Sequence, residues 1–256
     1  MSGMIGIFDS GSGGLTVLEA LRKRAPGADY VYFGDLAHMP YGNKARSEIH
    51  ELTQNGFKVL LREGATYFVS ACNSVSSSVK VRLLKRLGVS ESRVLSMVGP
   101  TVASMRQLQA NVLLVATRAT IESRVYEDAF AKVGIPVESL PLPDLVPCIE
   151  TEGREGEIPE MLKNTLVPKI KSHHTHIVLG CTHFPLVREL FFDVLRASGH
   201  ERVTLFDPAH PVADEVVARF DTKGAGTVHF VVSKHSDVFA RRAQMIAPGS
   251  ELTVLP

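Results

Sequence analysis

The chain has 256 residues, of which 45% are hydrophobic and 21% charged, with a formal net charge of +1; these values are typical of a globular protein of one large or two modest domains. The near-neutral charge and scattered basic residues do not indicate a surface that binds nucleic acid. No apolar run reaches the ~18 residues of a membrane-spanning helix. Three cysteines argue against a disulfide framework, and with no signal-like charged segment at the start we expect a cytoplasmic protein with reduced thiols.

Short apolar runs rich in β-branched residues alternate with longer amphipathic segments along the whole chain. The predicted strands are 4–8, 30–33, 67–71, 94–98, 112–116, 137–140, 177–180, 203–206 and 228–232. The predicted helices are 15–23, 47–63, 75–87, 101–108, 121–133, 159–171, 186–197 and 212–219. This alternation predicts an α/β fold of mostly parallel sheets with helices on both faces.

Four of the predicted strands end in similar polar turns, two in each half of the chain. Asp9 and Cys72 follow strands of the first half, and Thr117 and Cys181 follow strands of the second. The pattern indicates two pseudo-symmetric lobes, residues 1–98 plus 208–256 and residues 99–207. Because ligands bind beyond the carboxyl ends of strands in open α/β sheets, we expect the active site between the lobes.

The two cysteines of these turns are the main candidates for chemistry. Cys72 is followed by the polar residues Asn73 and Ser74, and Cys181 is followed two residues later by His183. A helix N-terminus lowers the pKa of a thiol, and a nearby histidine can exchange a proton with it. The alternative is that each cysteine is a small hydrophobic residue of the core.

Two loops at the same ends of the strands could line such a site. The Gly-rich stretch 9–14 precedes a helix, where backbone N–H groups bind anions. Its spacing matches neither common phosphate-binding pattern, so it could hold a phosphate, hold a carboxylate or form a structural turn. The turn 40–42, Pro-Tyr-Gly, follows the second strand and could also line the site.

Two other features are interpreted as structural. Cys148 lies among apolar neighbours, so we expect it to pack in the core. The histidine-rich run 173–176 resembles a metal-binding tract, but it lacks acidic or cysteine partners at ligand spacing, and we expect a surface loop.

Five stretches, in order and at matching spacing, resemble the glutamate racemase family, the cofactor-independent two-cysteine members of the aspartate/glutamate racemase superfamily. The resemblance covers nearly the whole chain and implies racemisation of glutamate without cofactor or metal, a homodimer, and supply of D-glutamate for peptidoglycan. The stretches are 9–14, 34–35 with 40–42, 71–73, 116–117 with 120–123, and 180–183 with Pro185.

The resemblance also implies a role for individual residues. Cys72 and Cys181 would be the catalytic acid/bases, with Asp9 assisting Cys72 and His183 assisting Cys181, so the two directions of racemisation should respond differently to changes at the two helpers. Glu150 matches an acidic position of the family near the second cysteine. The residues expected to hold the substrate are Ser10, Pro40, Tyr41, Gly42, Asn73, Ser74, Thr117, Thr120 and Thr182.

The chain departs from the family pattern at several positions around the expected site. Ser74 stands where threonine is usual, Phe184 replaces a common tyrosine, and Leu36-Ala37-His38 replaces Thr-Ala-Arg. The usual Cys-Pro is absent around 143–144. These departures concern substrate affinity and choice, and leave the proton-transfer pair intact.

Other functions fit some of the same residues. An aspartate or hydantoin racemase of the same superfamily would share the two cysteines. A cysteine hydrolase would use one thiol with His183 as base and leave the second cysteine unexplained. A zinc site of Cys72, Cys181, His183 and Asp9 fits by ligand type, and a non-catalytic amino-acid-binding module could share the two lobes.

Overall fold

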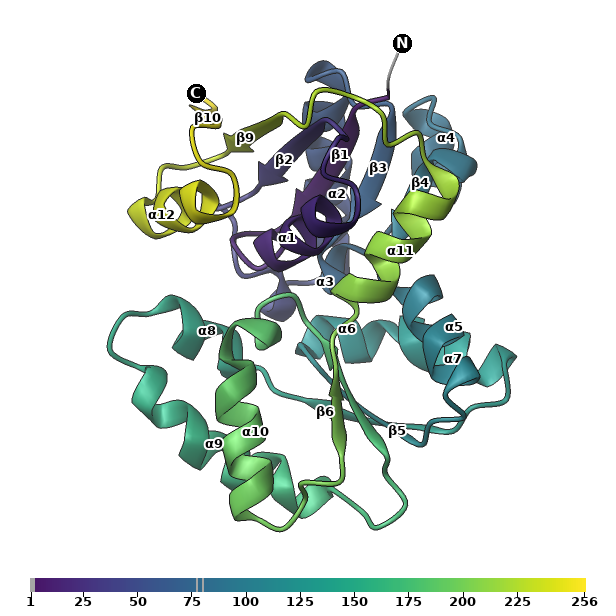
Figure 1. The fold of residues 1–256 in the computed structure, drawn as a ribbon, viewed down its shortest axis with the longest axis vertical. Helices are drawn as coiled ribbons and strands as arrows, with labels where there is room; N and C mark the ends of the chain where they lie inside the picture. The colour runs from purple at the N-terminus through teal and green to yellow at the C-terminus, as the bar shows by residue number, and fades with distance from the viewer. Residues whose placement is uncertain (1–2, 77, 80) are drawn as a thin grey trace.

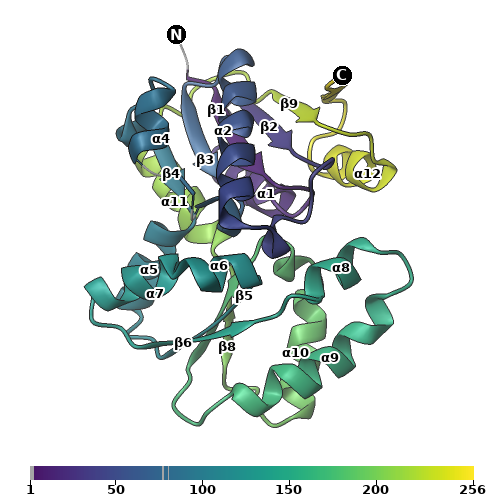
Figure 2. The ribbon, with the colours of Figure 1, turned by 180° about the vertical axis from the view of Figure 1, so that it is seen from behind.

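The structure, a computed structural model, describes residues 3–76, 78–79 and 81–256. These residues form two lobes, one above the other in Figures 1 and 2, each built on one parallel sheet. The predicted α/β fold of two lobes with parallel sheets and flanking helices is confirmed. Within the described residues, no helix is both long and apolar enough to cross a membrane.

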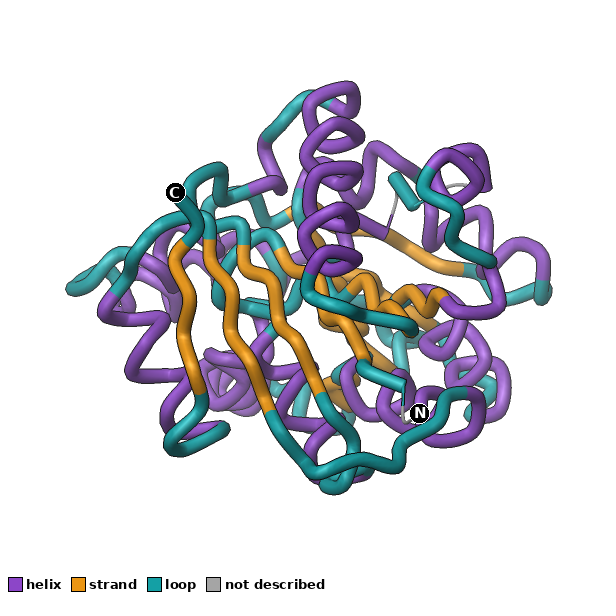
Figure 3. Tube along the Cα trace, turned by 90° about the horizontal axis from the view of Figure 1, so that it is seen from above, coloured by secondary structure: helices purple, strands orange, loops and turns teal. Residues whose placement is uncertain are grey.

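The first sheet contains strands from both ends of the chain, in the order β10-β9-β2-β1-β3-β4, and all its pairings are parallel. Parallel neighbours need crossover connections, which the intervening helices supply. Figure 3 shows these strands side by side with helices on both faces. The strands are β1 Ile5–Asp9, β2 Tyr30–Gly34, β3 Tyr67–Ser70, β4 Val94–Ser96, β9 Val228–Val232 and β10 Glu251–Val254.

The helices of this lobe bury one core on each face of the sheet. Side chains alternate between the faces of a strand, so Ile7 of β1 packs with the first and last helices, while Phe8 packs with the long helix α2 on the other face. The helices are α1 Leu15–Arg24, η1 Tyr41–Asn43, α2 Arg46–Arg62, α3 Asn73–Ser76, α4 Val81–Arg86, η2 Glu91–Arg93, α11 Ala209–Arg219 and α12 Asp237–Ile246.

The second sheet has the order β6-β5-β7-β8, again with parallel pairings only. Its strands are β5 Val112–Ala116, β6 Val137–Pro141, β7 His176–Gly180 and β8 Thr204–Phe206. One face packs against α5 Val98–Gln107, α6 Arg118–Ser123 and α7 Val125–Lys132. The other packs against α8 Leu145–Glu150, α9 Ile158–Thr165, η4 Val167–Lys169, η5 Phe184–Val187 and α10 Arg188–Ala197. The short η3 Glu155–Glu157 precedes α9 and has no buried residue.

The observed elements differ from the predicted ones mainly at boundaries. The strand predicted at 94–98 ends at Ser96, because α5 begins at Val98. The helix predicted at 121–133 is two helices, because Arg124 has a left-handed φ of 57° that ends α6. Residues 77 and 80 of the helix predicted at 75–87 lie outside the described part. Helices α8 and α12 and strand β10 were not predicted.

Candidate active site

The four polar turns identified in the sequence meet between the lobes, at the carboxyl ends of both sheets. Asp9 ends β1, Cys72 follows β3, Thr117 follows β5 and Cys181 follows β7. Together with their neighbours they line a small, nearly filled cavity of about 20 Å³. It is lined by Ser10, Pro40, Tyr41, Gly42, Cys72, Asn73, Ser74, Thr117, Val146, Gly180, Cys181, Thr182 and His183.

Three of the residues predicted for the site lie just behind this lining. Asp9 and Thr120 are fully buried, and Glu150 at the end of α8 contacts His183 from behind. The structure therefore brings all the predicted site residues together. Val146 and Gly180 line the cavity without having been predicted, because neither carries a polar side chain that the sequence could single out.

Cys72 is held as a protonated thiol. Its Sγ lies 3.4 Å from the Oγ of Ser10, and the side chain is buried. Burial, with the nearby charge of Asp9, raises the pKa of Cys72 to about 12 despite a hydrogen bond from Ser10 that lowers it. The expectation that a helix start lowers this pKa is therefore wrong for Cys72, because helix α3 has only four residues and burial outweighs its dipole.

Cys181 is paired with a histidine that carries a proton. The Sγ of Cys181 lies 4.0 Å from Nδ1 of His183. Burial opposes a charge on His183, but its contacts with Cys181 and Glu150 outweigh burial and raise the pKa of His183 to about 10. The second sulfur thus has a buried imidazolium beside it, whereas Cys72 has a carboxylate nearby.

Asp9 connects the two cysteine turns. Its Oδ1 accepts a hydrogen bond of 2.8 Å from the backbone N–H of Gly11, and its Oδ2 accepts one of 3.1 Å from the hydroxyl of Thr182. Burial raises the pKa of Asp9, while the charge of His183 and these hydrogen bonds lower it. Asp9 therefore acts on Cys72 through its charge, and its side-chain hydrogen bond goes to the opposite lobe.

The Gly-rich loop lets the lobes approach each other closely. A Cβ at Gly13 would overlap Nδ1 of His183 and lie 2.5 Å from Oγ1 of Thr182. The loop is therefore in contact with the second cysteine turn, and only glycine, which has no side chain, fits at position 13. Gly42 is similar, because a Cβ there would lie 2.7 Å from the Cβ of Thr117.

Hydroxyl groups from both lobes meet on one side of the cavity. The Oγ of Ser74 lies 3.0 Å from Oγ1 of Thr117 and 3.3 Å from Oγ1 of Thr120, and the two threonine oxygens are 3.0 Å apart. All three side chains are buried. Hydroxyl groups can turn to donate, so this cluster can bind a carboxylate.

Asn73 offers an amide donor whose orientation is set by a tyrosine. The hydroxyl of Tyr126 donates a hydrogen bond of 2.6 Å to Oδ1 of Asn73. The Nδ2 of Asn73 is buried and has no hydrogen-bond partner in the described protein. Because buried donors are normally satisfied, we expect this N–H₂ group to bind a ligand. Tyr126 was not identified from the sequence, since a tyrosine within the apolar pattern of a helix gives no polar signal.

Three side chains converge on Glu150. Its Oε1 accepts hydrogen bonds from Ser12 at 2.6 Å and from Nη1 of Arg242 at 3.1 Å. Nε2 of His183 lies 3.1 Å from the same oxygen and forms an ion pair with it. Burial opposes the charge of Glu150, but these contacts outweigh it and lower its pKa to about 2. Ser12 and Arg242 were not predicted.

Tyr41 lines the cavity with its ring. Its hydroxyl donates a hydrogen bond of 2.5 Å to Oδ2 of Asp35, and Ser233 donates one of 2.6 Å to Oδ1 of the same carboxylate. His38 contacts this carboxylate as well, at 2.8 Å. The unusual residue His38 is thus part of a network that supports the turn 40–42 from behind.

One group of potential metal ligands occurs in the described part of the chain, and it lies away from the cysteines. It consists of Glu138, His173 and His174. Nδ1 of His174 accepts a hydrogen bond of 3.0 Å from the backbone N–H of Lys171, so the proton of the neutral ring sits on Nε2. A metal needs the lone pair there, and the group does not fit a metal ion.

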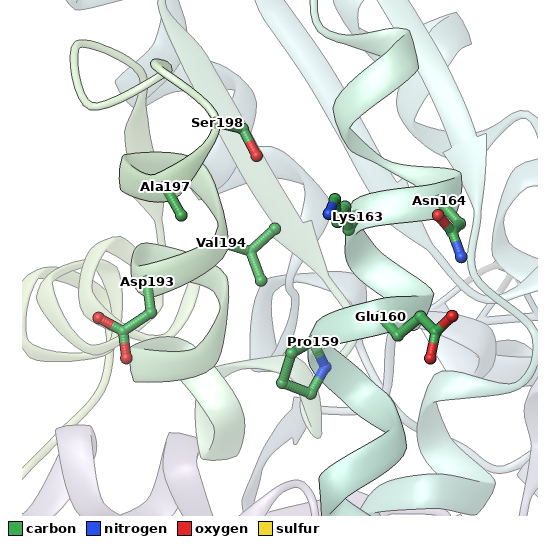
Figure 4. Close-up of a pocket in the computed structure, with 8 residues that line it drawn as sticks. All are labelled: Pro159, Glu160, Lys163, Asn164, Asp193, Val194, Ala197 and Ser198. Atoms are coloured by element: carbon green, nitrogen blue, oxygen red, sulfur yellow. The ribbon is translucent and has the colours of Figure 1, made fainter.

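A larger groove lies between α9 and α10 (Figure 4). It is lined by ends of surface side chains such as Lys163 and Asp193. It contains none of the predicted site residues, and the cavity between the lobes is therefore the candidate active site.

Comparisons with known proteins show which sequences this chain resembles. The pattern of the family described as Asp/Glu/Hydantoin racemase matches residues 15–216. Glutamate racemase 3 of Caldanaerobacter subterraneus subsp. tengcongensis is 33% identical over 96% of this chain and 91% of that protein. The glutamate racemase of Dinoroseobacter shibae is 34% identical over 83% of this chain and 82% of that protein.

Solved structures show the same fold. The glutamate racemase of Francisella tularensis in complex with D-glutamate has a TM-score of 0.84 and 26% identity, covering 100% of this chain and 98% of that one. The glutamate racemase isoform RacE1 of Bacillus anthracis has a TM-score of 0.87 at 23% identity, covering 99% and 97%. With the family pattern and these relatives, the chain belongs to the Asp/Glu/Hydantoin racemase family.

Proposed function

We propose that this chain, an isomerase by its family, interconverts L- and D-glutamate by proton transfer between Cα and two cysteines. The observation that carries the proposal is that Cys72 and Cys181 line one small cavity from opposite lobes. Racemisation removes a proton from one face of Cα and returns one to the other face, so two opposed groups suit it. The similar glutamate racemases support glutamate as the substrate.

The two cysteines start the reaction in different protonation states. Cys72 holds its proton and is the acid, so Cys181 is the base in this form of the enzyme. The Cα–H bond breaks as its proton passes to the Cys181 sulfur, and the Cys72 proton forms the new Cα–H bond on the opposite face. After this turnover the roles are exchanged, and the enzyme is ready for the other enantiomer. The imidazolium of His183 stabilises a thiolate at Cys181, whereas the carboxylate of Asp9 favours the protonated form of Cys72 and so returns that proton to it.

The carbanionic state needs its carboxylate stabilised. The hydroxyls of Ser74, Thr117 and Thr120 and the free amide protons of Asn73 are donors in the same half of the cavity. Hydrogen bonds across the lobes, such as the one between Ser74 and Thr117, hold the cavity closed. Substrate entry therefore requires the lobes to open, and closure excludes water from the intermediate.

Deuterium incorporation at Cα in D₂O tests the two-base assignment. We expect Cys72→Ser and Cys181→Ser each to lose racemisation by at least ~100-fold. Cys148→Ala is the matched control, because Cys148 is a free buried cysteine outside the cavity. If both serine variants racemise glutamate at the parent rate, the assignment is wrong.

A substrate panel without added cofactor tests the substrate choice. We expect glutamate to be racemised faster than aspartate or hydantoins. Faster turnover of aspartate or a hydantoin would contradict the proposal and point to the departures at Leu36, His38, Ser74 and Phe184. A burst of product from an ester, with no Cα exchange, would indicate a cysteine hydrolase.

Broader properties of the chain are proposed on the same basis. The proposed lobe boundaries are 1–98 with 208–256 and 99–207. We also propose a cytoplasmic homodimer whose D-glutamate enters peptidoglycan, acting without a cofactor. Sedimentation tests the dimer, and rescue of a D-glutamate-requiring bacterial strain tests the cellular role.

A further inference from the structure

Arg242 links the last helix of the chain to the catalytic machinery of the opposite lobe. It lies on α12 of the first lobe, and its Nη1 donates to Glu150 at 3.1 Å and to the hydroxyl of Ser12 at 2.9 Å. The side chains of Arg242 and Glu150 are 29% and 17% exposed. Its neighbour Arg241 also reaches across the lobes, to Glu152 at 3.7 Å, but those side chains are 66% and 85% exposed.

The contacts of Glu150 differ in which lobe supplies them. Ser12 and Arg242 belong to the first lobe, whereas His183 belongs to the second, like Glu150 itself. All three meet a single oxygen, Oε1 of Glu150. When the lobes separate, Ser12 and Arg242 leave this oxygen, while His183 can stay with it.

We propose that Arg242 is a positioning residue that couples closure of the lobes to the placement of the His183 imidazole beside Cys181, acting through Glu150. The proposal rests on the proposed racemase function. It assigns a role to α12, which contributes no residue to the lining of the cavity.

The charges around His183 give the direction of the effect. Cys181, Glu150 and Asp9 face it with negative or potentially negative groups, and Arg242 is the cation on Glu150. The positive charge of Arg242 partly offsets the negative charge of Glu150 at His183. Closure of the lobes, which brings Arg242 to Glu150, therefore lowers the pKa of His183. Without Arg242, Glu150 would hold that proton more tightly.

The first test compares Arg242→Gln with Arg241→Gln on the same helix. We expect Arg242→Gln to lower kcat by about 10-fold, as the loss of a charged hydrogen bond does, and to move the alkaline limb of the pH profile to higher pH. Arg241→Gln should keep the parent rate and profile, because an exposed ion pair contributes little. Arg242→Lys, which keeps the charge, should hold the limb near its parent position.

The second test needs no activity. The titration of His183 is followed by NMR of ¹³C-labelled histidine, with its signal assigned from His183→Asn. We expect the pKa of His183 to be higher in Arg242→Gln than in the parent, and the difference to vanish when both proteins also carry Glu150→Gln. Should Arg242→Gln not fold, Arg242→Met serves in its place, because it keeps an unbranched apolar stem.

Two results overturn the proposal. One is an unchanged His183 titration in Arg242→Gln, and the other is an equal loss of rate in Arg241→Gln. If the parent chain racemises no substrate of the panel while the His183 titration shifts as expected, the proposed function fails and the role of Arg242 in holding His183 stands.

Discussion

The hydroxyl of Thr182 donates a 3.1 Å hydrogen bond to Oδ2 of Asp9, so the residue next to Cys181 is bonded to the acid whose charge raises the pKa of Cys72. The bond crosses from one lobe to the other. It holds down the pKa of Asp9 against burial, and it therefore couples the electrostatics of the two cysteine turns.

Replacing Thr182 by valine should disturb both turns. Loss of the hydroxyl removes a hydrogen bond from Oδ2 of Asp9, raises the pKa of Asp9 further and weakens the charge that acts on Cys72. We expect kcat to fall by about 10-fold in steady-state assays of both enantiomers. Thr182→Ser, which keeps the hydroxyl, should stay within about 3-fold of the parent; a fall as large as that of valine would contradict this account.

Tyr126→Phe should weaken substrate binding more than the chemical step. The phenolic proton sets the orientation of the Asn73 amide, and the stacking of the ring on Phe130 is kept. We expect KM for glutamate to rise about 5- to 10-fold, in keeping with ~1 kcal/mol for one hydrogen bond, with a smaller change in kcat. An unchanged KM in a variant of parent-like thermal stability would show that Asn73 needs no such support.

Gly13→Ala should abolish most activity while the chain still folds. The added methyl group would overlap His183 and approach Thr182, so it pushes the second cysteine turn away from the first. We expect a loss of at least ~100-fold in kcat, because small displacements at a reacting centre cost that much. Gly99→Ala is the control, since a Cβ there meets no atom within 4 Å; equal losses in both variants would count against the close-approach argument.

Stability should depend on pH through His183. Its pKa is raised from 6.5 to about 10 in the folded chain, so its contribution to the free energy of unfolding is complete below pH 6.5 and is lost as the pH rises towards 10. Urea denaturation of the parent should show this decline. The decline should be shallower in His183→Asn, and equal slopes in the two proteins would mean that His183 is not held as an imidazolium.

Changes at the helpers Asp9 and His183 should affect the L-to-D and D-to-L reactions differently. The difference should appear in the separate values of kcat and KM, and not in their ratio kcat/KM. The enantiomers have equal free energies in water, so kcat/KM must stay equal for both directions in every variant. We expect Asp9→Asn and His183→Asn to change the ratio of the two kcat values in opposite senses, because each acts on a different sulfur. Progress curves from each pure enantiomer measure this, and shifts of the same sense would remove the assignment of separate helpers.

The amino-acid sequence is sufficient to establish the alternation of strands and helices and the positions where polar turns follow buried strands. Both follow from local periodicity, because a buried parallel strand is a short apolar run and its carboxyl end is where side chains can meet a ligand. For this reason Cys72, Cys181, Asp9 and His183 stand out in the sequence itself. The four residues of β10 are too short a pattern to indicate a strand. Helix α12 has ten residues and buries Phe239 and Ala243, and it was not predicted.

Contacts between distant parts of the chain determine how these residues act on one another. Tyr126 and Arg242 gave no signal in the sequence, because each gains its role from a partner far along the chain, Asn73 and Glu150 respectively. The prediction that a helix start lowers the pKa of Cys72 is wrong for the same reason. A local helix start is visible in the sequence, but burial and a carboxylate brought close by folding are not, and in the folded chain these two effects dominate the charge of the thiol.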